Sequence, residues 1–323
     1  MEREANFKFS KMKTAIFLMG PTACGKTELA IELASILPVE IINVDSAQIY
    51  IGMDIGTNKP TKDQLAVVKH HLIDICLPQN YYSVAEFCKN ANQLLEQIHS
   101  KGSIPLLVGG TMLYFYALCF GLSELPEKNI AIRNDISELA TQYGWPEMHA
   151  RLKKLDPGAA NKIEINDSQR IQRALEVITV TGGKKFSDHL IKQDRFLNDW
   201  NIHYFALLYQ DRAILHKNIE ERFYAMVKDG FVEEVEQLLQ QNIPLNMPSM
   251  RCVGYRQISE YLNNKSKISQ FDAYQKTIFA TRQLAKRQYT WLRKWQNIVD
   301  LNLLYSENSL EHKIGLITRF IKC

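Results

Sequence analysis

One eight-residue stretch, GPTACGKT at positions 20–27, constrains the fold of this 323-residue chain more than any other feature. It matches the pattern G-x-x-x-x-G-K-[ST] and stands between the apolar run TAIFLM (14–19) and the amphipathic segment TELAIELASIL (27–37). A strand before such a loop and a helix after it predict a phosphate-binding loop, with an anion at the positive end of the helix. The alternative is a glycine turn that only packs a helix on a strand.

The loop contains a full set of candidate phosphate ligands. Backbone N–H groups from 22 to 27 are expected to surround the anion, Lys26 adds a positive charge, and the Thr27 hydroxyl is a candidate ligand for Mg²⁺. The residues predicted to bind the phosphate groups are Gly20, Pro21, Thr22, Ala23, Cys24, Gly25, Lys26 and Thr27. This pattern indicates a di- or triphosphate without indicating which one.

Further apolar runs predict the other strands of a parallel sheet. They are VEIINVD (39–45), HHLIDI (70–75), IPLLVGG (104–110) and IHYFALL (202–208). Helical segments separate them, and one of these begins with the capping box SVAE at 83–86. Strands that alternate with helices around a phosphate loop predict an α/β fold, with a P-loop NTPase-like parallel sheet flanked by helices.

The character of the sequence changes between about residue 123 and residue 199. Strand signals vanish and the density of charged residues rises. Helical stretches are broken at GWP (144–146), DPG (156–158) and TGG (181–183). We therefore expect a mostly helical insertion domain at 123–199, within a catalytic core formed by 1–122 and 200–323. From residue 210 onwards the sequence predicts helices only.

The net charge and the cysteine content of the chain indicate which partners it can bind and in which compartment it works. Its 46% hydrophobic and 23% charged residues are typical of a soluble globular enzyme, and its net charge of +4 requires a local basic patch for any anionic partner. The cysteines at 24, 76, 88, 119, 252 and 323 lack zinc spacing. They predict reduced thiols and a cytoplasmic location. No apolar run is long enough to span a membrane, and we expect a monomer.

A second acidic residue for a metal ion is missing where a phosphate-loop NTPase carries it. The best candidate strand, IPLLVGG, ends in Gly109-Gly110-Thr111. Asp45 instead follows the strand after the phosphate-loop helix, at the ligand-bearing carboxyl edge of the sheet. A carboxylate there suits a general base, although a turn or N-cap aspartate has the same spacing. Gly110-Thr111 forms either an opening for a substrate or a tight turn.

The segment 272–295 predicts a helix with a basic face. The residues spaced i, i+4, i+7 and i+11 on this face are Arg282, Lys286, Tyr289 and Arg293. Cations with an interleaved aromatic ring favour a nucleic-acid backbone with stacked bases, and a solvated basic face is the alternative. Two more basic segments are QRIQR (169–173) and RCVGYR (251–256).

Taken together, these motifs resemble the tRNA dimethylallyltransferase (isopentenyltransferase) family in its bacterial form. Besides the phosphate loop they are DSAQIYIGMDIGTNKP, HHLIDI, PQNYYSVAEF, GGTMLY, NDSQRIQRALEV, RCVGYRQ and TRQLAKRQYTWLR. The resemblance implies transfer of a dimethylallyl group from dimethylallyl pyrophosphate to the exocyclic amine of the adenosine 3′ of the tRNA anticodon, with release of pyrophosphate. The phosphate loop then holds the donor pyrophosphate with Mg²⁺.

The resemblance also assigns roles to individual residues. Asp45 and Thr111 match the catalytic positions, as general base and nucleotide contact, and Arg222 matches a pyrophosphate ligand, for which Arg212 is the alternative. The residues that match tRNA-binding positions are Asp45, Ser46, Ala47, Gln48, Thr111, Arg133, Gln169, Arg170, Ile171, Gln172, Arg173, Arg251, Cys252, Val253, Gly254, Tyr255, Arg256, Lys286, Arg287, Gln288, Tyr289, Thr290, Trp291, Leu292 and Arg293.

Two other functions fit parts of the sequence. A small-molecule kinase would use the same fold, Asp45 and ATP on the loop, but it leaves the basic helix without a role. An RNA-binding nucleotide switch protein needs a guanine-reading N-K-x-D motif. The nearest tract, NKIE at 161–164, ends in the wrong acid.

Overall fold

The computed structural model of the protein describes residues 12–190, 196–302 and 309–322. The chain divides into two compact units. The first comprises Met1–Leu118 and Leu197–Cys323, and the second comprises Cys119–Phe196. The helical insertion domain at 123–199 stays a prediction, and its limits lie within four residues of those of the second unit.

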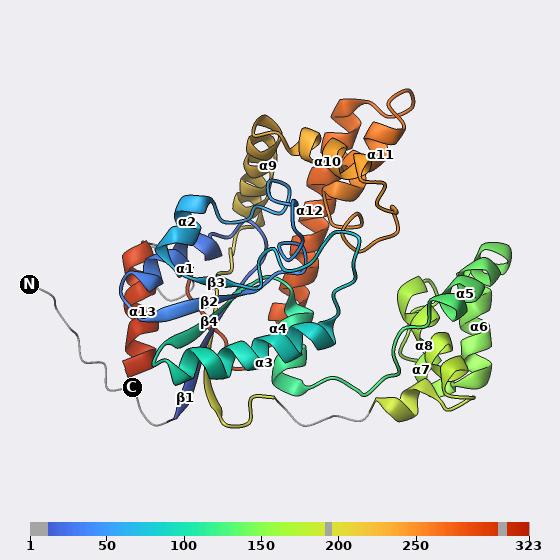
Figure 1. Cartoon of the computed structure of the whole chain (residues 1–323), viewed down its shortest axis with the longest axis horizontal. Coiled ribbons are helices and arrows are strands. Elements are labelled where there is room, and N and C mark those ends of the chain that lie inside the picture. Colours follow the sequence, from blue (N-terminus) through green and yellow to red (C-terminus); the bar gives the residue numbers. More distant parts are fainter. Residues whose placement is uncertain (1–11, 191–195, 303–308, 323) are drawn as a thin grey trace, which may run out of the picture. The chain divides into compact units, whose positions relative to one another are not determined.

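The first unit is built on a six-stranded sheet in which every pair of neighbouring strands is parallel (Figure 1). In spatial order the strands are β3 (His70–His71), β2 (Val39–Val44), β4 (Ile104–Gly109), β1 (Lys13–Met19), β5 (Trp200–Ala206) and β6 (Val299–Asp300). All six residues of β4 are buried, as expected for a central strand covered on both faces. The predicted α/β class with a parallel sheet is confirmed.

Strand β5 begins and ends two residues before the predicted segment 202–208, and two other strands differ more. The strand predicted at 70–75 pairs with β2 only over His70 and His71. Leu72 and Asp74 have positive φ angles of 63° and 54°, which turn the chain out of the sheet. Strand β6 lies where only helices were predicted, because two residues are too few to produce a periodic pattern.

Helices cover both faces of this sheet (Figure 1). On one face, α1 (Lys26–Ala34) and α13 (Leu310–Lys322) pack over a buried cluster that includes Ile16 and Leu18, and α2 (Lys62–Val67) also contacts α1. On the other face lie α3 (Val84–Ser100) and α4 (Met112–Phe120), where the ring of Phe115 lies 5.1 Å from that of Phe17. The predicted capping box is present at the first residues of α3.

Four more helices complete the first unit: α9 (Arg212–Lys228), α10 (Phe231–Gln240), α11 (Tyr255–Asn263) and α12 (Gln270–Leu292). They form a second buried cluster together with the loop that follows β2. Tyr50 and Met53 of that loop belong to the same cluster as Phe231 and Tyr255. The loop after β2 is therefore part of a packed core.

The second unit consists of α5 (Ile130–Tyr143), α6 (Trp145–Leu155), α7 (Pro157–Ala160), α8 (Ser168–Val180) and the 3₁₀ helix η1 (Phe186–His189). Its helices are interrupted at the three predicted breaks. Inside it, the fully buried Glu176 accepts the Asn129 N–H at 2.8 Å and pairs with Arg133 at 2.9 Å and Arg173 at 2.8 Å. Among the helices of the described ranges, none combines the length and apolar character that crossing a bilayer requires.

Candidate active site

The carboxyl ends of three neighbouring strands define the site. Val44 at the end of β2 and Met19 at the end of β1 both pair with Gly109 at the end of β4. Asp45 and Gly20 therefore follow strands that end level with one another. This is the edge at which open α/β sheets bind ligands.

The phosphate loop has the backbone conformation of an anion-binding nest. Ala23 and Gly25 have positive φ angles of 62° and 87°, so successive N–H groups turn toward one side. Helix α1 begins directly afterwards at Lys26, and its positive end adds to the attraction for an anion. Gly20 has no room for a side chain, because a Cβ there would lie 2.7 Å from the Cys24 Sγ.

Two of the predicted phosphate ligands have partners within the protein. The Lys26 Nζ donates to the Pro21 carbonyl oxygen at 2.7 Å. The Thr22 N–H donates to the Gln288 Oε1 at 2.9 Å. The prediction that all N–H groups from 22 to 27 surround an anion is therefore corrected for Thr22, whose N–H is satisfied by a side chain.

Gln288 joins the phosphate loop to the end of β4. Its Oε1 accepts from Thr22, its Nε2 donates to the Gly110 carbonyl oxygen at 2.9 Å, and the side chain is only 8% exposed. A Cβ at Gly110 would lie 2.3 Å from this Nε2, so the absence of a side chain there makes room for the amide. Gln288 also lines the cavity, and its predicted contact with RNA stays a prediction. Its spacing from the buried Ala285 and Leu292 is the signal that places it on the inner face.

Asp45 lies at the cavity wall directly after β2. Its Oδ1 accepts the N–H groups of Ala47 at 2.8 Å and Gln48 at 3.4 Å, so the aspartate forms a turn. In the part of the chain that the structure describes, these bonds engage one carboxylate oxygen, and Oδ2 keeps its capacity to accept a proton. The turn and general-base interpretations of Asp45 are thus compatible.

Thr111 connects the end of β4 to the turn after β2 through hydrogen bonds. Its N–H donates to the Val44 carbonyl oxygen at 3.1 Å, and its hydroxyl accepts the Ser46 N–H at 3.0 Å. The hydroxyl also lies 3.3 Å from the Ser46 Oγ, to which it donates. Thr111 therefore closes a tight turn and lines the cavity as well.

Arg222 on α9 reaches the phosphate loop, where its Nη2 donates to the Thr22 Oγ1. Burial lowers the pKa of this guanidinium, while the nearby Cys24 and Asp45 act in the opposite direction. Arg212, at the first residue of the same helix, is exposed and does not line the cavity. Of the two candidate pyrophosphate ligands, Arg222 is therefore the one at the site.

Thr22, Asp45, Thr111, Arg222 and Gln288 all line one cavity of about 510 Å³ in the first unit, and Thr22 alone among the predicted loop ligands, all of which the structure describes, does so. Its polar groups include Thr22, Asp45, Thr111 and Arg222. Its apolar and aromatic walls include Tyr50, Tyr82, Met112, Leu113, Tyr114, Ile219, Phe223, Met226, Phe231, Leu284 and Trp291. A largely apolar chamber with a few convergent polar groups is typical of a small-molecule site. Burial raises the pKa of the Cys252 thiol, which also lines this cavity, to about 12. The negative charge of Asp45 makes a smaller contribution in the same direction.

Most of the predicted tRNA-binding residues fall into three groups. Lining the cavity are Asp45, Ser46, Ala47, Thr111, Arg251, Cys252, Val253, Gly254, Arg287, Gln288 and Trp291. On the surface are Gln169 and Arg170 of the second unit, and Arg251, Arg256, Lys286, Arg287, Thr290 and Arg293 of the first. Arg133 and Arg173 form the ion pairs with Glu176, and the Gln172 amide donates to the Arg133 carbonyl oxygen and the Ser137 hydroxyl.

Several side chains predicted to contact RNA face inward instead. Ile171, Tyr255 and Leu292 are at most 1% exposed, because each belongs to the apolar face of its helix. The Tyr289 hydroxyl donates to the Tyr209 carbonyl oxygen at 3.1 Å and accepts the Tyr209 N–H at 2.9 Å. For Ile171, Tyr255 and Leu292 the prediction of RNA contact is corrected, whereas Tyr289 is half-buried and its contact with RNA stays a prediction. Arg282 of the predicted basic face pairs with Glu220 at 2.8 Å.

The protein offers few ligands for a metal ion bound at Thr27. Within the described ranges, no group of three or more histidine, cysteine, aspartate or glutamate side chains is placed to hold a metal. Mg²⁺ commonly takes one or two protein oxygens and completes its shell with water and substrate phosphates. The Thr27 hydroxyl at the start of α1 fits that arrangement.

The fold and the site define a phosphate-loop protein with a carboxylate at the wall of a partly apolar cavity, an arrangement suited to a phosphorylated compound with an apolar part. Residues 48–295 match the family model described as IPP transferase. A tRNA dimethylallyltransferase of Neisseria meningitidis serogroup C (strain 053442) is 49% identical over 282 residues, which cover 87% of this chain and 89% of the relative. The chain belongs to the IPP transferase family.

Solved structures with the same fold agree with this assignment. The full-length tRNA isopentenylpyrophosphate transferase of Bacillus halodurans matches with a TM-score of 0.67 at 33% identity, over 96% of this chain and 95% of that one. A eukaryotic dimethylallyltransferase described as acting on tRNA matches with a TM-score of 0.72 at 25% identity, over 96% of this chain and 79% of that one.

Replacing Arg222 by alanine is expected to weaken the binding of inorganic pyrophosphate by about tenfold to 10²-fold, because the loop loses a charge-assisted donor. Isothermal titration calorimetry measures this dissociation constant directly. Arg212→Ala is the matched control, since it removes an exposed arginine of the same helix and is expected to leave pyrophosphate binding unchanged. Equal losses in the two variants would contradict the assignment of Arg222.

Proposed function

We propose that this chain transfers a dimethylallyl group from dimethylallyl pyrophosphate to the exocyclic amine of the adenosine 3′ of the tRNA anticodon, releasing pyrophosphate. One observation carries the proposal most directly. Thr22 of the phosphate loop, Arg222 and Asp45 line a single partly apolar cavity, and the strand beside them ends in glycines where an NTPase has an acid. The likeness to tRNA dimethylallyltransferases supports the same activity.

In the proposed reaction, Asp45 accepts a proton from the adenosine amine while the nitrogen attacks the first carbon of the donor. The bond between that carbon and the pyrophosphate oxygen breaks, and the electron pair leaves with the pyrophosphate. Negative charge grows on the leaving group, where loop N–H groups, Lys26 and Arg222 stabilise it. The apolar walls hold the alkyl group and limit the access of water.

We further propose that the Thr27 hydroxyl binds Mg²⁺ together with donor oxygens. When bound, the ion neutralises charge on the departing pyrophosphate. The Lys26 Nζ, which donates to the Pro21 carbonyl oxygen, has to turn toward the donor when it binds.

The proposed RNA-binding surface consists of exposed residues, of which Arg251 and Arg287 also line the cavity. In the first unit these are Arg251, Arg256, Lys286, Arg287, Thr290 and Arg293. Lysine and arginine contacts to phosphate supply most of the affinity of such a surface and make it salt-dependent. A monomer located in the cytoplasm also stays a prediction. The five cysteines within the described ranges are thiols rather than disulfides, as in a reducing compartment.

A single labelling experiment tests the proposed function. The protein is incubated with dimethylallyl pyrophosphate labelled in its alkyl group, or with γ-labelled ATP, with and without unmodified tRNA. We expect the alkyl label to appear in tRNA as a modified adenosine, and no transfer of label from ATP. Transfer of the ATP label to a small molecule would favour the kinase, and nucleotide binding without any transfer would favour the switch protein.

A further inference from the structure

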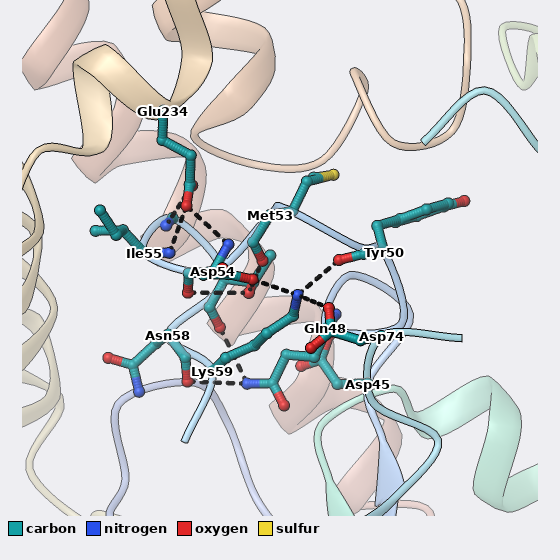
Figure 2. A network of polar contacts seen from close by, with 12 residues as sticks. Asp45, Gln48, Tyr50, Met53, Asp54, Ile55, Asn58, Lys59, Asp74 and Glu234 are labelled. Carbon is teal, nitrogen blue, oxygen red and sulfur yellow. Dashed lines mark hydrogen bonds and ion pairs between the residues drawn. The ribbon is translucent and has the colours of Figure 1, made fainter. Parts of the chain in front are cut away.

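The loop between β2 and α2 carries Asp45 at its beginning and is held by three sets of polar contacts (Figure 2). Gly56 and Thr57 of this loop line the cavity as well. The turn that positions Asp45 is therefore continuous with a segment whose position depends on groups far away in the sequence.

Glu234 of α10 provides the first set of contacts. Its Oε2 accepts the N–H groups of Asp54 at 2.8 Å and Ile55 at 2.7 Å, and its Oε1 accepts that of Gly56 at 3.0 Å. The Tyr255 hydroxyl also donates to Oε1. One carboxylate thus accepts four hydrogen bonds, three of them from consecutive backbone amides, and Figure 2 shows it pointing into this loop.

Lys59 provides the second set. Its Nζ donates to the Tyr50 carbonyl oxygen and to the Asp54 carboxylate, both at 2.6 Å, and to the Asp74 carboxylate. The lysine side chain is only 5% exposed. It closes the loop on itself, so residues 50, 54 and 59 move together.

Gln48 provides the third set and makes the connection to Asp45. Its N–H donates to the Asp45 Oδ1, while its Nε2 donates to the carbonyl oxygens of Thr57 at 3.1 Å and Asn58 at 3.0 Å. A displacement of residues 54–58 is therefore transmitted through this one side chain to the turn that orients the Asp45 carboxylate.

We propose that Glu234 is a positioning residue for the transfer reaction, because its carboxylate fixes the loop that orients Asp45. This inference rests on the proposed function, in which Asp45 takes the proton. Every partner of Glu234 is a donor, so only an ionised carboxylate satisfies all four at once. An amide at the same place would turn an NH₂ group toward at least one N–H or O–H donor and push the loop away.

The test is a double-mutant cycle between Glu234 and Asp45 in the full-length chain. The substrates are dimethylallyl pyrophosphate and an unmodified anticodon stem-loop RNA, and single-turnover rate constants are measured with excess enzyme. We expect Glu234→Gln to lower the rate constant by about 10²-fold, as a catalytic group displaced by about 1 Å does. The concentration of dimethylallyl pyrophosphate that gives half of the maximal single-turnover rate constant is expected to change much less than the rate constant itself.

In the Asp45→Asn background, the proton acceptor is already absent. The same Glu234→Gln change is then expected to alter the residual rate by less than about twofold, which gives strong non-additivity. A glutamate that only supports the fold would reduce the rate by the same factor in both backgrounds, and that result would overturn the proposal. A normal rate for the single Glu234→Gln variant would overturn it too.

Two more variants keep the experiment decisive. Tyr255→Phe removes one donor and keeps the carboxylate and the ring, and it is expected to lower the rate by about threefold to tenfold, but only when Asp45 is present. If the Glu234→Gln variant does not fold, Tyr255→Phe takes its place in the double-mutant cycle with Asp45→Asn. Glu233→Gln changes an exposed neighbour on α10 and is expected to leave the rate unchanged.

The same measurements separate this proposal from the proposed function. Absence of RNA alkylation by the wild-type chain removes the proposed function. Full activity of Asp45→Asn removes the general base and the positioning role together. If Asp45→Asn is impaired and Glu234→Gln is equally harmful in both backgrounds, only the positioning role is lost.

Discussion

Replacing Asp45 by alanine is expected to lower the rate of alkyl transfer to RNA by about 10² to 10⁴-fold, the range for removal of a general base. The carboxylate lines the cavity and engages the turn through one oxygen, and in the proposed reaction its other oxygen takes the proton. Binding of inorganic pyrophosphate is expected to persist, because no ligand of the phosphate loop is removed. Single-turnover alkylation and calorimetry measure these two quantities separately.

Asp45→Asn distinguishes the proton acceptor from the turn. Its side-chain carbonyl can still accept the Ala47 N–H, so the turn is retained while the basic oxygen is lost. We expect a loss close to that of the alanine variant. Near-normal activity of the asparagine variant would show that Asp45 acts through the turn alone. Asp63→Ala, at an exposed aspartate of α2, serves as the control and is expected to have no effect.

Replacing Glu176 by glutamine is expected to destabilise the second unit by about 3 kcal/mol, at the low end of the range for breaking a buried ion pair. The carboxylate is fully buried between Arg133 and Arg173, and both guanidiniums lose their counter-charge. The low end applies because both arginines keep partial access to water. Hydrogen exchange of the α5 and α8 amides is expected to accelerate by about 10²-fold.

The control for this prediction is Glu138→Gln, at an exposed glutamate of α5 that is expected to leave the exchange unchanged. The pH dependence gives a second check. Burial raises the pKa of Glu176, but hydrogen bonds from Arg133, Arg173 and the Asn129 N–H outweigh it, and the net pKa lies below its ordinary value. The stabilisation is therefore complete above the ordinary glutamate pKa and is lost as the pH falls through the lowered value. Unchanged protection in acid would contradict this ion-pair account.

Local patterns predicted the parts of the structure that depend on neighbouring residues. The phosphate loop between β1 and α1, the buried strand β4 and the capping box of α3 all follow from short-range signals. Asp45 at a strand end could be placed at the ligand-bearing edge, but its proximity to Gly110 depends on β2 and β4 being neighbours. Strand order is not encoded in any single segment.

The contacts that complete the site join distant residues. Gln288 meets Thr22 across 266 positions, and Glu234 meets the amides of the loop after β2 across about 180. Nothing local distinguishes this glutamine from its neighbours on a basic helix except the period of the buried face. The error for Leu292 has the same origin, because a helix of 23 residues has several faces and only the tertiary fold selects the buried one.

The glycines at the end of β4 separate this scaffold from enzymes that consume nucleoside triphosphates. A Cβ at Gly109 would lie 2.0 Å from the Val44 carbonyl oxygen, and one at Gly110 would collide with the Gln288 amide. An acidic side chain at either position cannot be accommodated while the backbone and Gln288 stay in place. An acid at Gly109 would thus require the backbones of β2 and β4 to move apart, and an acid at Gly110 would require the loss of the Gln288 amide that links this strand end to the phosphate loop.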